Sequence, residues 1–297
     1  MPKILVVGDA MLDRYVYGHC PRLSPEAPVP IMRVTSQTLR PGGACNVAMN
    51  VQSLGIDCRL LSIVGQDQAA KDLVSTMQSQ LSHFHLQQTR AKTTVKTRHI
   101  AGTHHLLRID TESECPVEQV DDVLRYLQGY IGEAQWVIFS DYGKHFQQRS
   151  QEIIQIANEA KVPIAVDPKS DDWEKYRGAD LITPNFSEFQ MVENGMTPQR
   201  LLKKFGIKEL VVTEGAQGMS HWTQKRKGPI HRDAIAQAIL DPCGAGDTAV
   251  AAFVAGKVRR WSVENCLEYA NEAAGQVCQK MGTHAARDVT FPVRKAA

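Results

Sequence analysis

Short runs of apolar residues recur along the chain and alternate with segments in which apolar residues follow a helical period. A strand that is buried on both faces reads as a continuous apolar run, and a helix between two such runs supplies the crossover of a parallel sheet. The alternation therefore predicts an α/β fold, with a mainly parallel central sheet flanked by helices on both faces. The expected strands are residues 4–7, 60–64, 136–139, 164–166, 181–182 and 210–212.

Polar or glycine-containing turns follow these runs. In open α/β sheets, ligands bind outside the carboxyl ends of the strands, so we expect the turns to share one cleft. The turns are Gly8-Asp9, Gly65-Gln66-Asp67, Ser140-Asp141, Asp167-Pro168, Thr183-Pro184-Asn185 and Thr213-Glu214-Gly215.

Two stretches, about 13–34 and 94–110, depart from this pattern. Alternating residues such as Val95, Thr97 and His99 predict short antiparallel strands, the second pair folding about Gly102-Thr103. We interpret the two stretches as a small antiparallel β flap, or lid, over the cleft. An exposed sheet needs cover, which a substrate supplies on one side and a second subunit on the other, so the flap also predicts a homodimer.

Composition and charge narrow the class of protein. Of 297 residues, 43% are hydrophobic and 22% charged, which is the balance of one globular domain spanning 1–297. The 34 Lys and Arg nearly balance the 32 Asp and Glu, so we expect neither nucleic-acid nor membrane partners. No signal-peptide pattern or apolar run long enough to span a bilayer occurs, and the seven cysteines show no Cys-x-x-Cys spacing. These features predict a cytoplasmic protein with reduced thiols.

The residues with the clearest chemistry form the turn Gly244-Ala245-Gly246-Asp247, which opens a helix of small residues. The free N–H groups and the dipole at a helix N-terminus hold an anion, and the same field should keep Asp247 ionised. An ionised carboxylate beside such a turn suits phosphoryl transfer, because it accepts the proton of a substrate hydroxyl while the turn stabilises the moving phosphoryl group.

Two other interpretations of this turn stay open on the motif alone. Asp247 could simply cap a closely packed core helix. Gly244-x-Gly246-x-x-Ala249 also matches a dinucleotide fingerprint, but that fingerprint belongs in the first βα unit, where this chain has Gly8-Asp9 instead. No Walker phosphate loop occurs in the sequence.

Four motifs in this order resemble the ribokinase-like (PfkB) carbohydrate kinases over nearly the whole chain. They are Gly8-Asp9, Gly42-Gly43-x-x-Asn46-x-Ala48, Asn185-x-x-Glu188 and Gly244-Ala245-Gly246-Asp247. Longer passages at 8–15, 24–30, 167–169, 176–179 and 183–185 look most like kinases of D-glycero-D-manno-heptose 7-phosphate, which occur alone or as the first half of a bifunctional ADP-heptose synthesis enzyme.

The resemblance implies transfer of the ATP γ-phosphate to the anomeric hydroxyl of the heptose 7-phosphate, giving a 1,7-bisphosphate for lipopolysaccharide precursor synthesis. A kinase of the same fold for another sugar or sugar phosphate is the nearest rival. A non-catalytic sugar-phosphate sensor and an NAD-dependent oxidoreductase are disfavoured alternatives. Since the sequence ends at Ala297, soon after Gly282-Thr283-His284, we expect no nucleotidyltransferase half.

On the substrate side, the resemblance implies that Asp9 and Asp13 accept hydrogen bonds from sugar hydroxyls, although a turn and a helix cap would explain them equally simply. Cationic side chains are more often solvated surface charges. For the sugar phosphate we favour Arg108 and Lys169 over the other candidates, which are Arg14, Lys96, Arg98 and Lys144. The predicted substrate-binding residues are Asp9, Asp13, Gly42, Gly43, Asn46, Arg108 and Lys169.

On the nucleotide side, the resemblance links Asn185 and Glu188 to Mg²⁺, and we expect this contact to run through waters because Mg²⁺ keeps much of its hydration shell. A helix start with an acidic first turn would explain the same pair. The predicted nucleotide-binding residues are Asn185, Thr213, Glu214, Gly215, Gly218 and Asn271.

Two departures from the family pattern bear on this site. The family usually has Thr where Cys243 follows Asp241-Pro242, which puts in doubt a monovalent cation such as K⁺ held by Asp241 and backbone carbonyls. Close relatives tend to have Thr-Arg-Ser in place of Thr213-Glu214-Gly215, so nucleotide binding here could be weaker or altered.

Overall fold

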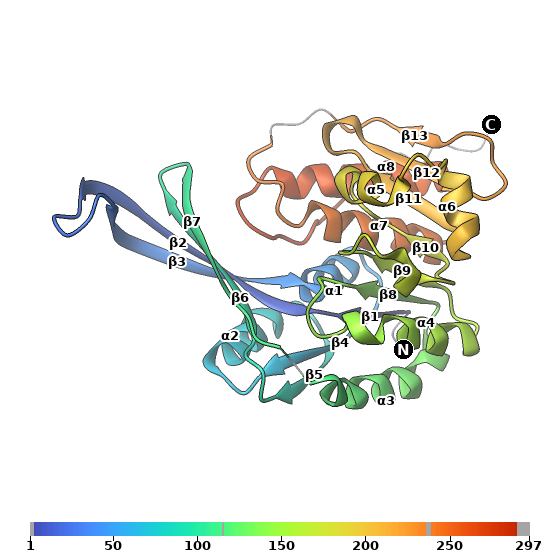
Figure 1. Cartoon of the computed structure of the whole chain (residues 1–297), viewed down its shortest axis with the longest axis horizontal. Helices are drawn as coiled ribbons and strands as arrows, with labels where there is room; N and C mark the ends of the chain where they lie inside the picture. Colours follow the sequence, from blue (N-terminus) through green and yellow to red (C-terminus); the bar gives the residue numbers. More distant parts are fainter. Residues whose placement is uncertain (1–2, 115, 236–238, 290–297) are drawn as a thin grey trace.

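The computed structural model describes residues 3–114, 116–235 and 239–289, and at its centre lies a nine-stranded sheet covered by helices on both faces (Figure 1). Seven neighbouring strands of this sheet are parallel to one another, and two further strands pair antiparallel at one edge. The order is β13 (Ile230–Arg232), β12 (Met219–Thr223), β11 (Glu209–Thr213), β10 (Leu181–Ile182), β9 (Ile164–Asp167), β8 (Trp136–Ser140), β1 (Ile4–Gly8), β4 (Cys58–Gly65) and β5 (His83–Thr89).

The six apolar runs predicted from the sequence all become strands of this sheet. The central strand β1 shows why its run is continuous: side chains alternate between the two faces of a strand, and both faces are buried. Ile4 and Val6 pack into one hydrophobic core, and Leu5 and Val7 pack into the other. The sheet therefore separates two cores, each closed by its own helices.

Helices α1, α2, α7 and α8 contribute to the core with Ile4 and Val6, and α3, α4, α5 and α6 to the core with Leu5 and Val7. Among the described residues, no helix is both long and apolar enough to cross a membrane. The helices are α1 (Ala44–Ser53), α2 (Gln68–Met77), α3 (Asp121–Tyr130), α4 (Ser150–Glu159), α5 (Phe186–Glu193), α6 (Pro198–Phe205), α7 (Ala245–Val258) and α8 (Val263–Cys278). Short 3₁₀ turns occur at Val117–Val120, Ile131–Glu133, Gln147–Arg149, Trp173–Tyr176 and Gly215–Gln217.

A second sheet of four strands forms the predicted flap and projects away from the large sheet (Figure 1). Its order is β3 (Pro30–Gly43), β2 (Ala10–Leu23), β6 (Thr94–Ala101) and β7 (His104–Thr111). The two hairpins, β2 with β3 and β6 with β7, are antiparallel as expected, but β2 and β6 join them through a parallel pairing that the sequence did not indicate.

The flap is connected directly to the large sheet. Only Asp9 separates β1 from β2, and β3 ends at Gly43, immediately before α1 begins. The carboxyl end of the central strand, the base of the flap and the N-terminus of α1 therefore meet at one place.

Candidate active site

The glycine turn at the start of α7 lies at this meeting point. Gly244 has φ +81° and is the N-cap of α7. A Cβ at this position would lie 2.7 Å from Asn46 Nδ2, so both the backbone conformation and the close approach require glycine. Ala245 donates its N–H to Pro242 O at 3.2 Å, while Gly246 is exposed and has no atom within 4 Å of where a Cβ would stand. The turn is therefore closed on one side and open at Gly246.

Asp247 is almost completely buried, and two uncharged side chains hold its two carboxylate oxygens. Asn46 Nδ2, on α1, donates to Oδ2 at 2.8 Å, and the Tyr142 hydroxyl donates to Oδ1 at 2.7 Å. Asn50 Nδ2 donates to Asn46 Oδ1 at 3.2 Å, which orients the Asn46 amide. Tyr142 was not among the predicted site residues, although it follows the polar turn after β8.

Burial shifts the pKa of Asp247, which the sequence predicts to be ionised. It raises the pKa to about 6, against the opposing hydrogen bonds from Asn46 and Tyr142. Burial dominates because the charged carboxylate loses its hydration. A group with this pKa is mostly deprotonated at neutral pH and still accepts a proton readily, which suits a general base.

The carboxylate of Asp9, which was predicted to contact sugar hydroxyls, is bound by backbone N–H groups of the loop after β8. Its carboxylate is fully buried and accepts backbone N–H groups from Tyr142 at 2.9 Å, Lys144 at 3.1 Å and His145 at 2.8 Å. Burial, followed by the charge of Asp141, raises its pKa to about 6 against these N–H donors. Asp9 therefore organises the loop after β8, and a buried carboxylate with three donors leaves little for a sugar.

The substrate side of the site lies at the base of the flap. Asp13, on β2, forms a buried ion pair with Arg98 on β6, and a Cβ at Gly42 would lie 2.3 Å from Asp13 Oδ2. The ammonium group of Lys96 lies 5.2 Å from the centre of the Tyr142 ring. Burial lowers the pKa of Lys96, as do the nearby charges of Arg108 and Arg98, whereas Asp13 raises it.

The remaining substrate-side residues flank this group. Gly43 is the N-cap of α1, next to Asp9. Arg108, on β7, is half-exposed and pairs with Asp110 through two hydrogen bonds, at 2.8 and 3.1 Å. A cleft of about 460 Å³ runs from Arg108 and Arg98 to Asp241 and Cys243, so the flap cations face the segment that precedes the glycine turn.

Lys169 lies apart from the flap cations, with the predicted metal residues. Its ammonium group is 2.9 Å from Glu188 Oε1. Asn185 and Glu188 form a capping box at the start of α5: Asn185 Oδ1 accepts the Glu188 N–H at 2.9 Å, and Glu188 Oε2 accepts the Asn185 N–H at 3.0 Å. The motif therefore does start a helix, as one of its two interpretations predicted. The second carboxylate oxygen of Glu188, Oε1, faces the Lys169 ammonium group.

Asp167, at the end of β9, adds a buried carboxyl group to this region. Burial, followed by the charges of Asp247 and Glu188, raises its pKa well above the usual range. Clustered carboxylates that raise one another's pKa suit a nearby divalent cation. Among the described residues, however, no three His, Cys, Asp or Glu side chains converge to hold a metal. The donor set therefore fits a hydrated Mg²⁺ that travels with a nucleotide, rather than an ion caged by the protein.

The predicted nucleotide residues form two groups, one where β11 ends and one at the end of β13. Thr213 ends β11 and pairs with Asn185 through an isolated bridge. Gly218 has φ +100°, and a Cβ there would lie 2.0 Å from Arg232 O. Asn271 Nδ2 donates to the same carbonyl at 3.0 Å, so these two residues position the end of β13.

Glu214 and Gly215 begin the short turn between β11 and β12. The Glu214 N–H donates to Gly218 O at 2.8 Å, and its carboxylate lies 3.5 Å from His231 Nδ1. Glu214 therefore points toward β13.

Both oxygens of Asp241 already accept backbone N–H groups, from Cys243 and from Gly282, each at 2.9 Å. Burial alone would raise its pKa, but these bonds outweigh burial, and the pKa lies below its usual value. Asp241 is therefore an ionised buried carboxylate that joins the turn to the segment after α8. The K⁺ expected at this position stays a prediction.

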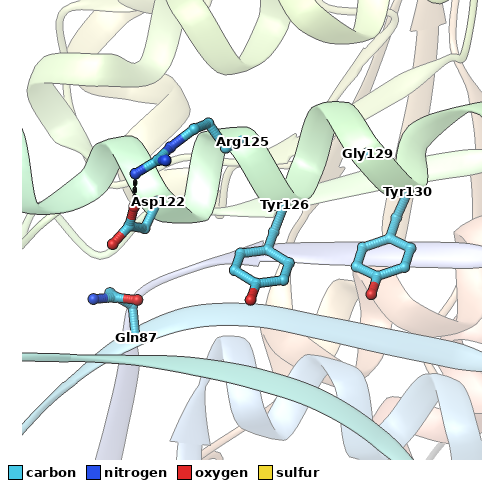
Figure 2. Close-up of a pocket in the computed structure, with 6 residues that line it drawn as sticks. All are labelled: Gln87, Asp122, Arg125, Tyr126, Gly129 and Tyr130. Atoms are coloured by element: carbon cyan, nitrogen blue, oxygen red, sulfur yellow. Dashed lines mark hydrogen bonds and ion pairs between the residues drawn. The ribbon is translucent and has the colours of Figure 1, made fainter.

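A larger cleft, of about 620 Å³, lies on α3 and the neighbouring edge strand (Figure 2). Tyr126 and Tyr130 extend side by side from α3 toward it, and Arg125 pairs with Asp122 on the same helix. No residue that lines this cleft was predicted to act in the site, and none contacts Asp247. The candidate active site is therefore the group around Asp247.

Comparison with known proteins shows which family this chain resembles. The sequence profile described as "pfkB family carbohydrate kinase" matches residues 1–289. The chain is 38% identical to "Bifunctional protein HldE" of Histophilus somni over 293 residues, covering 95% of this chain and 61% of that protein. It is 39% identical to the protein of the same name from Yersinia enterocolitica, covering 94% and 60%. The chain thus spans about 60% of the length of these relatives.

Solved structures share the fold at lower sequence identity. Phosphofructokinase-2 from Escherichia coli, in complex with substrates and products, superposes with a TM-score of 0.81 at 17% identity, covering 97% of this chain and 96% of that one. Arabidopsis thaliana ribokinase, complexed with ribose and ATP, gives a TM-score of 0.74 at 20% identity, covering 95% and 94%. The α/β sheet with its attached flap is therefore a ribokinase-like fold.

Proposed function

The chain belongs to the pfkB family of carbohydrate kinases, which makes it a phosphotransferase acting on a sugar hydroxyl, and on that premise we propose its substrate. We propose that it phosphorylates the anomeric hydroxyl of D-glycero-D-manno-heptose 7-phosphate with ATP, giving the 1,7-bisphosphate in the cytoplasm. The observation that carries the chemistry is the buried Asp247 carboxylate, held by two neutral donors beside an open helix N-terminus. The relatives named HldE and the heptose-kinase-like passages support the substrate.

In the proposed reaction, the anomeric oxygen attacks the γ-phosphorus, the bond to the ADP oxygen breaks, and Asp247 takes the hydroxyl proton. Backbone N–H groups at the start of α7 stabilise negative charge on the phosphoryl group as it moves. Mg²⁺ bound with ATP would neutralise phosphate charge, held through waters by Asn185 and Glu188.

We assign the cations to two ends of the site according to their positions. Lys96 and Arg108 are proposed to face the sugar 7-phosphate, since the charge of Arg108 lies close enough to lower the pKa of Lys96. Arg98 is committed to Asp13, so it orients a hydroxyl acceptor and adds positive field. Lys169, which pairs with Glu188, is proposed to contact the ATP phosphates, a revision of its predicted place at the sugar phosphate.

The test is ATP consumption by the wild-type protein and by Asp247→Asn, with heptose 7-phosphate, fructose 6-phosphate, ribose and adenosine as acceptors. Heptose 7-phosphate should give the highest kcat/KM. Asp247→Asn should lose at least about 100-fold in kcat, because a general base typically contributes 10²–10⁴-fold.

The outcomes separate the rival functions. Strong turnover of ribose with none of heptose 7-phosphate would overturn the substrate while leaving a sugar kinase. Saturable sugar-phosphate binding without ATP turnover, by wild-type protein and variant alike, would favour a non-catalytic sensor. Full turnover by Asp247→Asn would remove this residue as the base.

We also propose that a second copy of the chain covers the outer part of the flap. Leu107 and Ile109 alternate along β7 and therefore share one face, and their exposed fractions are 57% and 47%. Val34, on β3, is 60% exposed. Large apolar side chains on a projecting sheet are expected to be covered by a partner.

A further inference from the structure

Tyr142 contacts the proposed base, Asp247, and it also contacts Asp9 and Lys96, which lie in two other parts of the chain. It lies in the loop after β8, and Asp9 binds the N–H groups of Tyr142, Lys144 and His145 within that loop. Because Asp9 immediately follows the central strand β1 and is fully buried, the loop is attached to a completely buried part of the sheet. The hydrogen bonds to Asp9 therefore fix the direction in which the Tyr142 side chain leaves the backbone.

The two ends of the Tyr142 side chain meet different partners. Its hydroxyl donates to Asp247 Oδ1 at 2.7 Å, and its ring faces the ammonium group of Lys96 at 5.2 Å. Lys96 belongs to the flap, whereas Asp247 belongs to α7. One side chain thus connects the base of the cleft with its cover.

We propose that Tyr142 is a positioning residue, which together with Asn46 fixes the plane of the Asp247 carboxylate for proton transfer. This inference rests on the proposed function. A single donor would leave the carboxyl free to rotate about χ2, but donors on both oxygens fix it. Each oxygen retains a second lone pair, so the substrate hydroxyl can still donate to the same carboxylate.

Tyr142 does not compete with Asp247 for the proton. Burial, followed by the charge of Asp247, raises the pKa of the Tyr142 phenol well above its usual value. The phenol therefore keeps its proton throughout: the substrate proton moves to Asp247, and the O–H of Tyr142 remains a donor. Its role is to orient the acceptor and to favour the charged form.

The charges around Asp247 determine the direction of the expected pH effect. Asp13, on β2, raises the pKa of Asp247, while Lys96, on β6, lowers it. The Cys45 thiol on α1 and the Asp167 carboxyl at the end of β9 also lie within electrostatic range. Removing the Tyr142 hydroxyl leaves these groups in place and removes one donor that favours the carboxylate, so the pKa of Asp247 must rise.

Tyr142→Phe tests the proposal, and Tyr176→Phe is its matched control. The Tyr176 hydroxyl also donates to a carboxylate at 2.7 Å, that of Asp141, next to Tyr142, but it does not reach Asp247. For Tyr142→Phe we expect kcat to fall about tenfold with KM for sugar and ATP within about twofold. The acidic limb of the kcat/KM profile should move up by about one pH unit, as loss of a hydrogen bond to a charged group implies.

Tyr176→Phe should lower Tm and leave the position of the limb unchanged. An equal shift in both variants, or an unshifted limb and unchanged kcat in Tyr142→Phe, would overturn the positioning role. Asp247→Asn is measured alongside. If that variant is inactive while Tyr142→Phe behaves as wild type, only this inference fails; if Asp247→Asn retains activity, the proposed function fails with it.

Discussion

Gly244 and Gly246 lie two residues apart in one turn, but an added methyl group would meet different surroundings at each. At Gly244, φ is +81° and the new Cβ would lie 2.7 Å from Asn46 Nδ2. At Gly246, no atom lies within 4 Å of the new Cβ. Alanine at the two positions therefore separates the stability of the turn from access to it.

Gly244→Ala should destabilise the fold, whereas Gly246→Ala should leave its stability nearly unchanged. Holding an alanine in the left-handed region costs about 1–2 kcal/mol. The overlap also pushes the Asn46 amide away from Asp247, and a lost hydrogen bond to a charged acceptor costs about 1.5–3 kcal/mol. Allowing for relaxation, Gly244→Ala should lower the free energy of unfolding by about 3 kcal/mol, or Tm by about 6–12 °C. Gly246→Ala places a better helix former in the first turn of α7, and Tm should stay within about 2 °C.

Activity should fall in Gly246→Ala even though its stability does not. The methyl group of Gly246→Ala would occupy the open side of the turn, where the γ-phosphate is proposed to approach. A displacement of about 1 Å at the reacting centre costs on the order of 100-fold, so we expect that loss in kcat/KM. Calorimetry and ATP consumption on the same preparations measure both quantities. Wild-type kcat/KM for Gly246→Ala, at unchanged Tm, would refute the passage of the phosphoryl group over this side of the turn.

Two further predictions concern stability and assembly. Glu209 accepts hydrogen bonds from Lys257, at 2.8 and 3.0 Å, and contacts His221 at 2.8 Å. Burial opposes ionisation, but these partners prevail and lower the pKa of Glu209 to about 2. A depressed pKa stabilises the fold above the unfolded-state value of about 4.3 and loses this effect as pH falls toward 2. Glu209→Gln should therefore cost about 2 kcal/mol at pH 7 in urea unfolding, a difference that narrows below about pH 4; a gap independent of pH would contradict the role of the charge. Leu107→Glu should convert the proposed dimer to monomer by light scattering without lowering Tm by more than about 2 °C, and an unchanged mass would remove the outer flap as the interface.

The main strands could be predicted because they are buried on both faces, which makes their sequences continuously apolar. The strands that went unnoticed lie at or next to the edges of the large sheet. β5 mixes polar and apolar residues, because most of its side chains are only partly buried, and β12 and β13 are short and antiparallel. A half-buried edge strand carries too little apolar periodicity to be distinguished from a loop.

The site residues were harder to predict than the strands, because a sequence does not show where a carboxylate points. Asp9 follows a strand just as a ligand-binding residue would, but its partners are the N–H groups of a loop more than 130 residues away. Tyr142 was missed for the same reason, since its hydroxyl bonds to a residue 105 positions later. Local motifs indicated the turn at Asp247, and only the folded chain revealed the donors around it.

The bond between Asn46 and Asp247 joins residues 201 positions apart, and this separation affects how the protein is made. At 5–20 residues per second, a ribosome adds Asp247 roughly 10–40 s after Asn46. During that time α1 exists without α7, the helix that shares its core, and buried residues of α1 such as Val47 and Val51 lack their final cover. Contacts of such long range also slow folding after release. The proposed catalytic carboxylate is therefore completed late in synthesis, and a nascent chain is vulnerable to aggregation along α1 until it is.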